Sequence, residues 1–299
     1  MGAAALECCM KYFLDIVQGF DLGTYHFLSR FAGNWFIDRL VYFQESEQIL
    51  KGGLILAAYW WLWFRGGSDR EKRRTAIIAI MSATVLAVVV TRILAAATPL
   101  RLRPIYVPNL EHHWSVPIDA SFAQWNSFPS DTAAYFCALT FGLIVLLPRL
   151  KVPIVLYTAG WICFPRVYFG YHYASDMVAG AVIGVAVVWA VLRAERSQSA
   201  IVPRVVAYAD SRPHVFYAAA FLISFEMATV FWDVRMLERK LVHATRMLGH
   251  HASRAPSPSS PADSLLAFTA LLLVVAAAVV ILHIRQSARG RMQITPHRR

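Results

Sequence analysis

Charged residues are scarce in this sequence of 299 residues: Asp, Glu, Lys and Arg make up 16%, whereas hydrophobic residues make up 58%. The mean hydropathy of +0.48 is too apolar for a soluble domain of this length. Acidic residues are the scarcer charge, 18 against 29 basic ones, which leaves a net charge of +11. The basic residues gather in short clusters beside apolar runs, as the cytoplasmic flanks of membrane helices do, so we expect no nucleic-acid partner. The composition predicts an all-α protein, a polytopic transmembrane helical bundle.

Cysteine is also rare, with four in the chain: Cys8, Cys9, Cys137 and Cys163. Their spacing matches neither a disulfide framework nor a metal-binding motif. Cys137 and Cys163 fall in apolar runs, where a thiol behaves as a small core residue. The sequence also lacks an internal repeat and the glycine motifs of dinucleotide-binding and P-loop proteins.

Long apolar runs are abundant and predict the membrane crossings, at residues 49–64, 75–97, 132–148, 152–164, 176–192, 214–232 and 264–284. Residues 1–48 mix aromatic and charged residues without a full apolar crossing, so we expect short amphipathic helices in the interface, with a tilted first crossing as the alternative. The chain therefore divides into interfacial helices (1–48), a transmembrane core (49–193) and a C-terminal extension with two apolar helices and a basic tail (194–299).

The strongest topology signal is the segment 65–74, which holds five basic residues. The positive-inside tendency places this segment in the cytoplasm. The loop 98–131 and the stretch 164–176 then both face outward, and two separate polar loops converge on one membrane surface. We expect an integral protein of a bacterial inner membrane, with an active site at the outer membrane–water interface, facing the periplasm.

The stretch 164–176 carries the residues with the clearest chemistry, Arg166, His172 and Asp176. If the helix after this stretch is already wound at His172, its imidazole and the Asp176 carboxylate lie four residues apart on one face. A carboxylate beside an imidazole fixes its tautomer and makes the other ring nitrogen a better nucleophile or base. Arg166 is a candidate clamp for an oxyanion. The alternative is a membrane-interface loop, in which aromatics and a single His or Arg are common.

Three pieces occur in a fixed order along the chain: Arg103-Pro104, then Pro129-Ser130-Asp131-Thr132, then Arg166-x5-His172-x3-Asp176. This order resembles the type 2 phosphatidic acid phosphatase superfamily, which includes membrane lipid phosphatases and the vanadium haloperoxidases. The family pattern is Lys-x6-Arg-Pro, Pro-Ser-Gly-His and Ser-Arg-x5-His-x3-Asp. The resemblance covers roughly residues 75–192, and the third motif is its specific part.

The resemblance implies a role for each matching position. His172 corresponds to the nucleophile that takes the phosphoryl group as phosphohistidine, and Asp176 to the residue that orients its imidazole. Arg103, Ser130 and Arg166 correspond to the groups that bind the phosphoryl oxygens. Such hydrolases use no metal or other cofactor, so none is expected here.

The chain departs from the first motif, where Ala96 stands at the position of the lysine. Arg92 and Arg101 are the candidate replacements. Arg92 lies deep in an expected span, where an arginine is costly enough to suggest a function, with an interhelical hydrogen bond as the equal alternative. Arg101 lies nearer the loop, and we expect it to bind substrate phosphate or a lipid headgroup. Pro165 replaces the serine before Arg166, a change that we expect to matter little.

The second motif departs more seriously, because Thr132 replaces the histidine that protonates the leaving group. A hydroxyl is a poor proton donor at neutral pH. The candidate acids are Asp131, if burial raises its pKa, and His112 or His113 from the same loop. Asp131 and Thr132 with Ser130 also form a good helix start, and a helix N-terminus is itself an anion site, so we expect Thr132 to bind phosphate.

An acidic leaving group would remove the need for that acid, since a diphosphate releases phosphate. We therefore expect a membrane phosphatase for a lipid phosphate or diphosphate, with a polyprenyl diphosphate favoured over a glycerolipid phosphate. The alternatives are a lipid-to-lipid phosphotransferase and a non-catalytic phospholipid-binding or transport protein on the same scaffold. A transporter or channel unrelated to phosphate is disfavoured, because the polar residues lie in loops. The hairpin 214–284 is a candidate surface for a homo-oligomer or a partner enzyme.

Overall fold

The computed structural model describes residues 3–108, 110, 113–118, 126–198 and 201–229, apart from the side chains of 3–10, 195–198 and 201. These residues fall in one compact unit, residues 1–232. Helices are the only regular structure in the described residues, so the chain is all-helical as predicted. The last residues (230–232) of the expected span 214–232 and the whole expected span 264–284 lie outside the described residues, as does His112.

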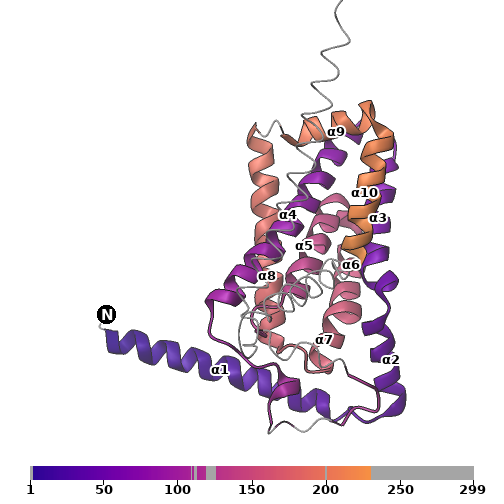
Figure 1. The fold of residues 1–299 in the computed structure, drawn as a ribbon. Helices are drawn as coiled ribbons and strands as arrows, with labels where there is room; N and C mark the ends of the chain where they lie inside the picture. The colour runs from indigo at the N-terminus through magenta and orange to yellow at the C-terminus, as the bar shows by residue number, and fades with distance from the viewer. Residues whose placement is uncertain (1–2, 109, 111–112, 119–125, 199–200, 230–299) are drawn as a thin grey trace, which may run out of the picture. The chain divides into compact units, whose positions relative to one another are not determined.

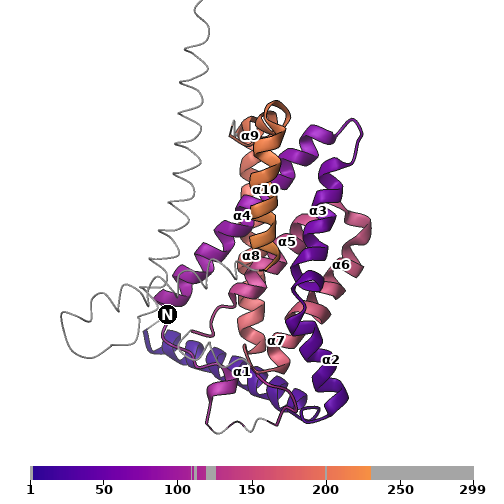
Figure 2. The ribbon, with the colours of Figure 1, turned by 45° about the vertical axis from the view of Figure 1, so that its right-hand side comes forward.

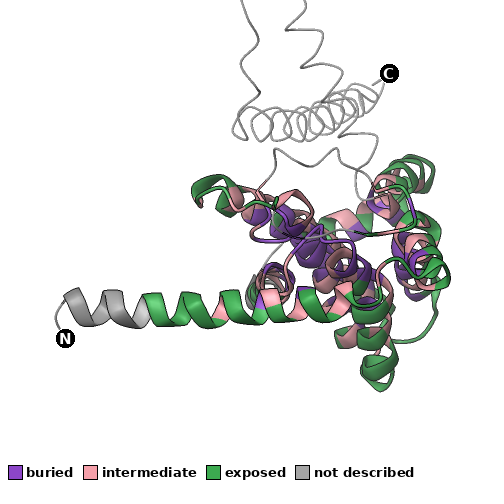
Figure 3. Cartoon of the chain, turned by 90° about the horizontal axis from the view of Figure 1, so that it is seen from below, coloured by how far each residue is buried: buried purple, intermediate pink, exposed green. Residues whose placement is uncertain are grey.

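The N-terminal segment forms two helices, α1 (Ala3–Ser29) and α2 (Trp35–Ser46). The turn between them contains Gly33, whose φ of 85° suits glycine, and Asn34, whose side chain accepts bonds from the first amides of α2. We expected short helices here, but α1 is 27 residues long, because no proline interrupts it. It runs crosswise to α4 and α8 (Figures 1 and 2), and much of its surface is exposed (Figure 3).

Three helices form the centre of this unit: α4 (Arg70–Ala97), α5 (Asp131–Leu146) and α8 (Ala174–Gln198). Two glycines of α8 allow its close approach to α5. A Cβ on Gly180 or Gly184 would lie 2.2 Å from the carbonyl oxygen of Ser130 or Ala134 respectively. Small residues spaced four apart are typical of tightly packed helices in membranes. This contact places the first turns of α5 and α8 side by side.

Two of the described helices are long and apolar enough to cross a membrane, Arg70–Ala97 and Ala174–Ala194. The shorter apolar helices are Ile49–Phe64, Asp131–Leu146 and Pro213–Ala228. All the expected spans within the described part of the chain therefore coincide with helical segments, although length and composition single out only α4 and α8 as candidate crossings.

Two expected spans are not regular α-helices. Residues 49–64 divide into the π-helical η1 (Ile49–Gly53) and α3 (Leu54–Phe64). Residues 152–164 fall in a segment made of α6 (Lys151–Tyr157), the π-helical η4 (Thr158–Cys163) and α7 (Phe164–Tyr168). A π-helical turn adds a residue per turn and rotates the next part of the helix about its axis, which an apolar run does not predict. The remaining elements are α9 (Ile201–Ser211), α10 (Pro213–Ala228) and the short 3-10 turns η2 (Pro104–Tyr106) and η3 (Pro148–Leu150).

The basic turn between α3 and α4 also has a structural part. Arg73 donates from Nε to the carbonyl of Leu62 at 2.8 Å, and Arg74 donates to the carbonyl of Trp63 at 3.1 Å. Arg74 also pairs with Asp210 of α9 at 2.9 Å. The last carbonyls of a helix lack intrahelical partners, so these side chains complete the end of α3. This turn is at the start of α4, whereas the polar loops that carry the motifs begin after its end.

Candidate active site

The candidate site is built where α4 ends and where α5 and α8 begin. Asn126 donates to the carbonyl of Ala95 at 2.9 Å and accepts from the amide of Arg101 at 3.1 Å, which ties the loop to the end of α4. Ser130 is the N-cap of α5, and its amide donates to the carbonyl of Asp176 in α8 at 3.1 Å. Two adjacent helix N-termini favour an anion, because their first amides and dipoles are positive.

His172 lies at the centre of these contacts and is 2% exposed. Its Nδ1 is 2.9 Å from the carbonyl oxygen of Ser127, and its Nε2 is 3.1 Å from Nη1 of Arg103. A carbonyl can only accept and a guanidinium can only donate, so this arrangement selects the tautomer with the proton on Nδ1. Nε2 therefore keeps its lone pair and presents it toward Arg103.

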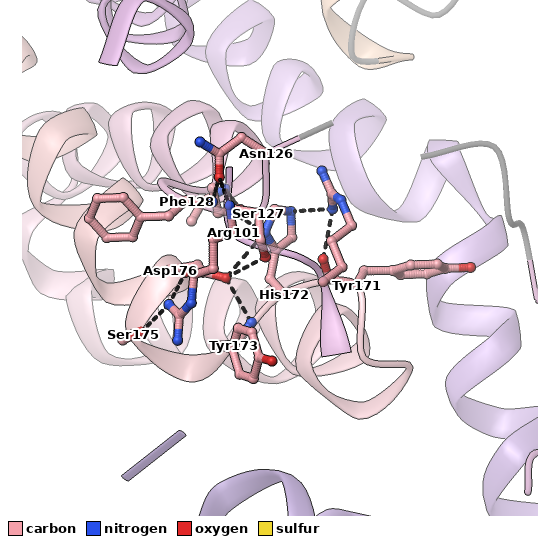
Figure 4. Close-up of polar contacts among 12 residues, drawn as sticks. Arg101, Asn126, Ser127, Phe128, Tyr171, His172, Tyr173, Ser175 and Asp176 are labelled. Atoms are coloured by element: carbon pink, nitrogen blue, oxygen red, sulfur yellow. Dashed lines mark hydrogen bonds and ion pairs between the residues drawn. The ribbon is translucent and has the colours of Figure 1, made fainter. Parts of the chain in front are cut away.

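Asp176 supports the imidazole differently from the sequence prediction. Helix α8 begins at Ala174, after His172, and the distance from Asp176 Oδ2 to His172 Nδ1 is 3.9 Å. Asp176 Oδ2 instead accepts hydrogen bonds from Ser127 Oγ at 2.6 Å and from the Tyr173 amide at 2.9 Å (Figure 4). The carboxylate thus holds the serine whose carbonyl orients the imidazole. The sequence motifs did not indicate Ser127, although it lies only two residues before Pro129.

Arg101 lies between two carboxylates. Its guanidinium pairs with Asp176 Oδ1 and with Asp21 Oδ2 of α1, each at 2.5 Å, and lies over the ring of Tyr173 at 4.0 Å. Asp21 also accepts from the amide and hydroxyl of Ser175 at 2.8 and 2.6 Å. These contacts bind Arg101 to the carboxylate side of the site, so its expected role as a phosphate ligand stays a prediction. The sequence did not predict Asp21 as part of the site, and its only signal was a carboxylate in an aromatic-rich stretch.

Arg103 faces the reactive side of His172. Its Nη1 also donates to the Tyr171 carbonyl at 2.7 Å. Burial lowers the pKa of Arg103 to about 10, and the nearby charges of Asp131, Arg166 and Arg92 act on it in addition. The guanidinium therefore remains charged at neutral pH. Its position beside Nε2 suits a donor to an anion that the imidazole attacks.

The other two arginines each have a carboxylate partner. Arg166 pairs with Glu45 of α2 at 3.2 Å, and Arg92 pairs with Asp131 at 2.6 Å. Arg92 lies one turn before Ala96 on the same face of α4, so it is near the position at which the family pattern has its lysine. Both guanidinium groups act electrostatically on Arg103, which places three arginine charges around one locus.

Thr132 occupies the position at which the family pattern has its histidine. Thr132 is buried in the first turn of α5, and its amide donates to Asp131 Oδ1 at 2.8 Å. The ion pair with Arg92 gives Asp131 a charge partner, so its role as an acid stays a prediction. His113 is exposed and its carbonyl lies beside Gly33. The contacts of His172 described above do not include His113.

The electrostatics favour a neutral imidazole. Burial, and then the positive charge of Arg103, hold the pKa of His172 below its usual range, although Asp176 opposes the shift. A neutral imidazole, whose Nε2 carries a lone pair instead of a proton, is the form that acts as a nucleophile. In the described residues, no group of three or more His, Cys, Asp or Glu side chains could hold a metal ion.

The comparison with protein families points to one superfamily. The model of the PAP2 superfamily matches residues 75–199. This match confirms, over residues 75–199, the resemblance that the three motifs indicated. The match supports a phosphatase-type function in broad terms. No curated protein and no solved structure matches the chain. The matched segment does not include α1, α2 or α3, so Asp21 and Glu45 contact the site from outside it.

Proposed function

We propose that the protein is an integral membrane phosphatase that removes a phosphate from a lipid diphosphate or phosphate through a phosphohistidine at His172. The observation that carries the proposal is the orientation of this imidazole: Nδ1 is 2.9 Å from the Ser127 carbonyl, and Nε2 faces Arg103 at 3.1 Å. A nucleophile with its lone pair beside a fixed cation is suited to attack an anionic group. Phosphoryl transfer depends mainly on such positioning and charge stabilisation.

In the first step, Nε2 of His172 attacks phosphorus in line with the leaving oxygen, so that an N–P bond forms as the P–O bond breaks. Arg103 and Arg166 donate to the phosphoryl oxygens, where charge accumulates. The imidazole becomes cationic, and Asp176 at 3.9 Å offsets that charge. In the second step, water attacks phosphorus and its released proton passes to solvent, while the N–P bond breaks and the electron pair returns to Nε2. The Ser127 carbonyl holds the Nδ1 proton in place throughout.

The proposed substrate preference depends on Thr132, which replaces the histidine that protonates the leaving group. An alkoxide leaving group needs a proton, and loss of a general acid costs about 10²–10⁴-fold in rate. A phosphate leaving from a diphosphate needs far less protonation. A lipid diphosphate, with a polyprenyl diphosphate favoured, is therefore the substrate class that these residues serve best. Lipid-to-lipid phosphotransfer would use the same first step, with a lipid phosphate in place of water in the second.

A membrane location is part of the proposal. Helices α4 and α8 have the length and hydropathy of spans. The crosswise helix α1 exposes large apolar side chains, among them Tyr12, Phe13 and Phe20, which suits a helix in the plane of the interface. With the basic turn 65–74 in the cytoplasm, the site faces the periplasm of a bacterial inner membrane. The proposed division of the chain is an interfacial segment (1–48), a core (49–193) and an extension (194–299). The extension is the proposed surface for a second copy or a partner enzyme.

The test is to trap the intermediate. Protein in nanodiscs is mixed with lipid diphosphates and lipid monophosphates labelled with ³²P on the terminal phosphate, quenched, and analysed for acid-labile, alkali-stable label. We expect label on wild type and none on His172→Ala, with faster release of phosphate from the diphosphate. Equal rates from the matching monophosphate would contradict the diphosphate preference. Equal background release from both proteins would contradict the enzyme and favour the non-catalytic lipid binder, whereas label recovered on a second lipid would indicate phosphotransfer.

A further inference from the structure

Glu45, near the end of α2, lies between two cations. Its Oε1 is 3.2 Å from Nη1 of Arg166, and its Oε2 is 3.3 Å from Nζ of Lys51. The Lys51 side chain is 3% exposed and the Glu45 side chain is 14% exposed. Both Glu45 and Lys51 belong to the N-terminal region that precedes the family match. The three charges thus form a largely buried row, with the carboxylate in the middle.

Arg166 is tied to the nucleophile by its main chain. Its carbonyl accepts hydrogen bonds from the amides of Tyr171 at 3.0 Å and His172 at 3.2 Å. Its guanidinium lies 5.5 Å from the ring of Tyr171. The buried Nε of Arg166 has no hydrogen-bond partner among the described residues. The main chain therefore fixes the origin of the side chain, while the ion pair with Glu45 holds its guanidinium end.

Removal of the carboxylate would leave Arg166 and Lys51 without the partner that they share. Arg166 and Lys51 already oppose one another electrostatically. A largely buried guanidinium without its charge partner is unfavourable, so a side chain would move to relieve it. Arg166 is the one whose position matters for a phosphoryl group.

We propose that Glu45 is a positioning residue that fixes the Arg166 guanidinium for the phosphoryl oxygens and shields it from Lys51. The inference rests on the proposed function, since it assigns a role in the same site. It also extends the active site beyond the PAP2 segment into α2 and η1. If Glu45 only lowered the positive potential of the site, its removal would have the opposite effect, and an anion would bind more tightly.

The test measures equilibrium binding of inorganic phosphate and orthovanadate to purified full-length protein, which requires no turnover. We expect Glu45→Gln to weaken binding of both by about tenfold or more. The matched control is Glu47→Gln, which changes a nearby glutamate that has no ion pair among the described side chains and is expected to leave binding unchanged. Tighter or unchanged binding by Glu45→Gln would overturn the inference.

Two double variants separate positioning from loss of folding. In an Arg166→Met background, Glu45→Gln should produce no further loss, whereas independent, additive losses would overturn the inference. Glu45→Gln with Lys51→Met removes the unpaired buried lysine, so it should fold and bind phosphate at least about threefold more tightly than Glu45→Gln alone. If this double variant folds but its phosphate binding does not recover, the inference is also overturned. If wild type binds neither anion, the proposed function fails together with this inference. Binding that Glu45→Gln retains while Arg166→Met loses it contradicts only the inference.

Discussion

Substitution of Asp21 by asparagine tests whether α1 is a working part of the site. Asp21 is 1% exposed and accepts bonds from Arg101 at 2.5 Å and from the amide and hydroxyl of Ser175 at 2.8 and 2.6 Å. Asparagine keeps the shape and one acceptor oxygen, but it removes the charge that Arg101 pairs with. An amide group would also direct donors at two groups that are themselves donors.

The magnitude depends on burial. Removal of one partner of a fully buried ion pair costs about 3–5 kcal/mol. The Arg101 side chain is 29% exposed and keeps its pair with Asp176, so solvent and the second carboxylate reduce the cost. We expect a loss of about 2 kcal/mol in unfolding free energy, which corresponds to about 4–8 °C in Tm for a unit of this size.

The assay is thermal unfolding in detergent, monitored by tryptophan fluorescence. Asp15→Asn is the matched control, because Asp15 is an exposed aspartate on the same helix, and its Tm should match that of wild type. We expect kcat to fall as well in Asp21→Asn, since Arg101 would no longer be held on both sides of Asp176. A Tm for Asp21→Asn within about 1 °C of the Tm of the control would refute the claim that α1 is anchored through this carboxylate.

Three further outcomes are expected. The pH profile of kcat/KM should rise from acid pH to a plateau with a midpoint below 6.5, because neutral His172 is the reactive form. Asp176→Asn should move that midpoint to lower pH, because Asp176 raises the pKa of His172. A move to higher pH would contradict the assignment. Ser127→Ala keeps the carbonyl that orients the imidazole but loses the bond to Asp176, so kcat should fall about tenfold at unchanged KM, and an unchanged kcat would refute the relay. Gly184→Ala places a Cβ 2.2 Å from a backbone carbonyl of α5, so it should lower the unfolding free energy, measured by thermal unfolding, by about 1–3 kcal/mol. The control Gly160→Ala, whose Cβ would meet nothing within 4 Å, should change stability little. Equal effects would contradict the close packing of α8 on α5.

Local sequence patterns predicted the helical segments well, because apolar runs and N-cap residues act within a few residues of one another. The start of α5 is an example: Ser130 before an apolar run predicted a helix, and the structure has Ser130 as its N-cap. The π-helical turns η1 and η4 were not predicted, since an apolar run has the same appearance whichever hydrogen-bond register it adopts.

Pairing of charges could not be predicted in the same way. Arg101 and Arg103 are separated by one residue, yet the first pairs with Asp21 and Asp176 and the second lies beside His172. Pro104 marks Arg103 as the motif residue, but neither arginine's neighbours in the sequence predict its partner. The difference arises because the fold brings Asp21 of α1 and the first turn of α8 to Arg101, and the Tyr171-His172 segment to Arg103.

The amino-acid sequence by itself determined the class of the protein and the order of its reactive residues, because hydropathy and motif chemistry are properties of short stretches. Only the tertiary structure decided that a serine carbonyl orients the imidazole, and that carboxylates from α1 and α2 hold two of the arginines. These choices depend on which distant segments are buried together. In a dry interior each charge must find a partner, and that partner can come from any part of the chain that the fold brings near.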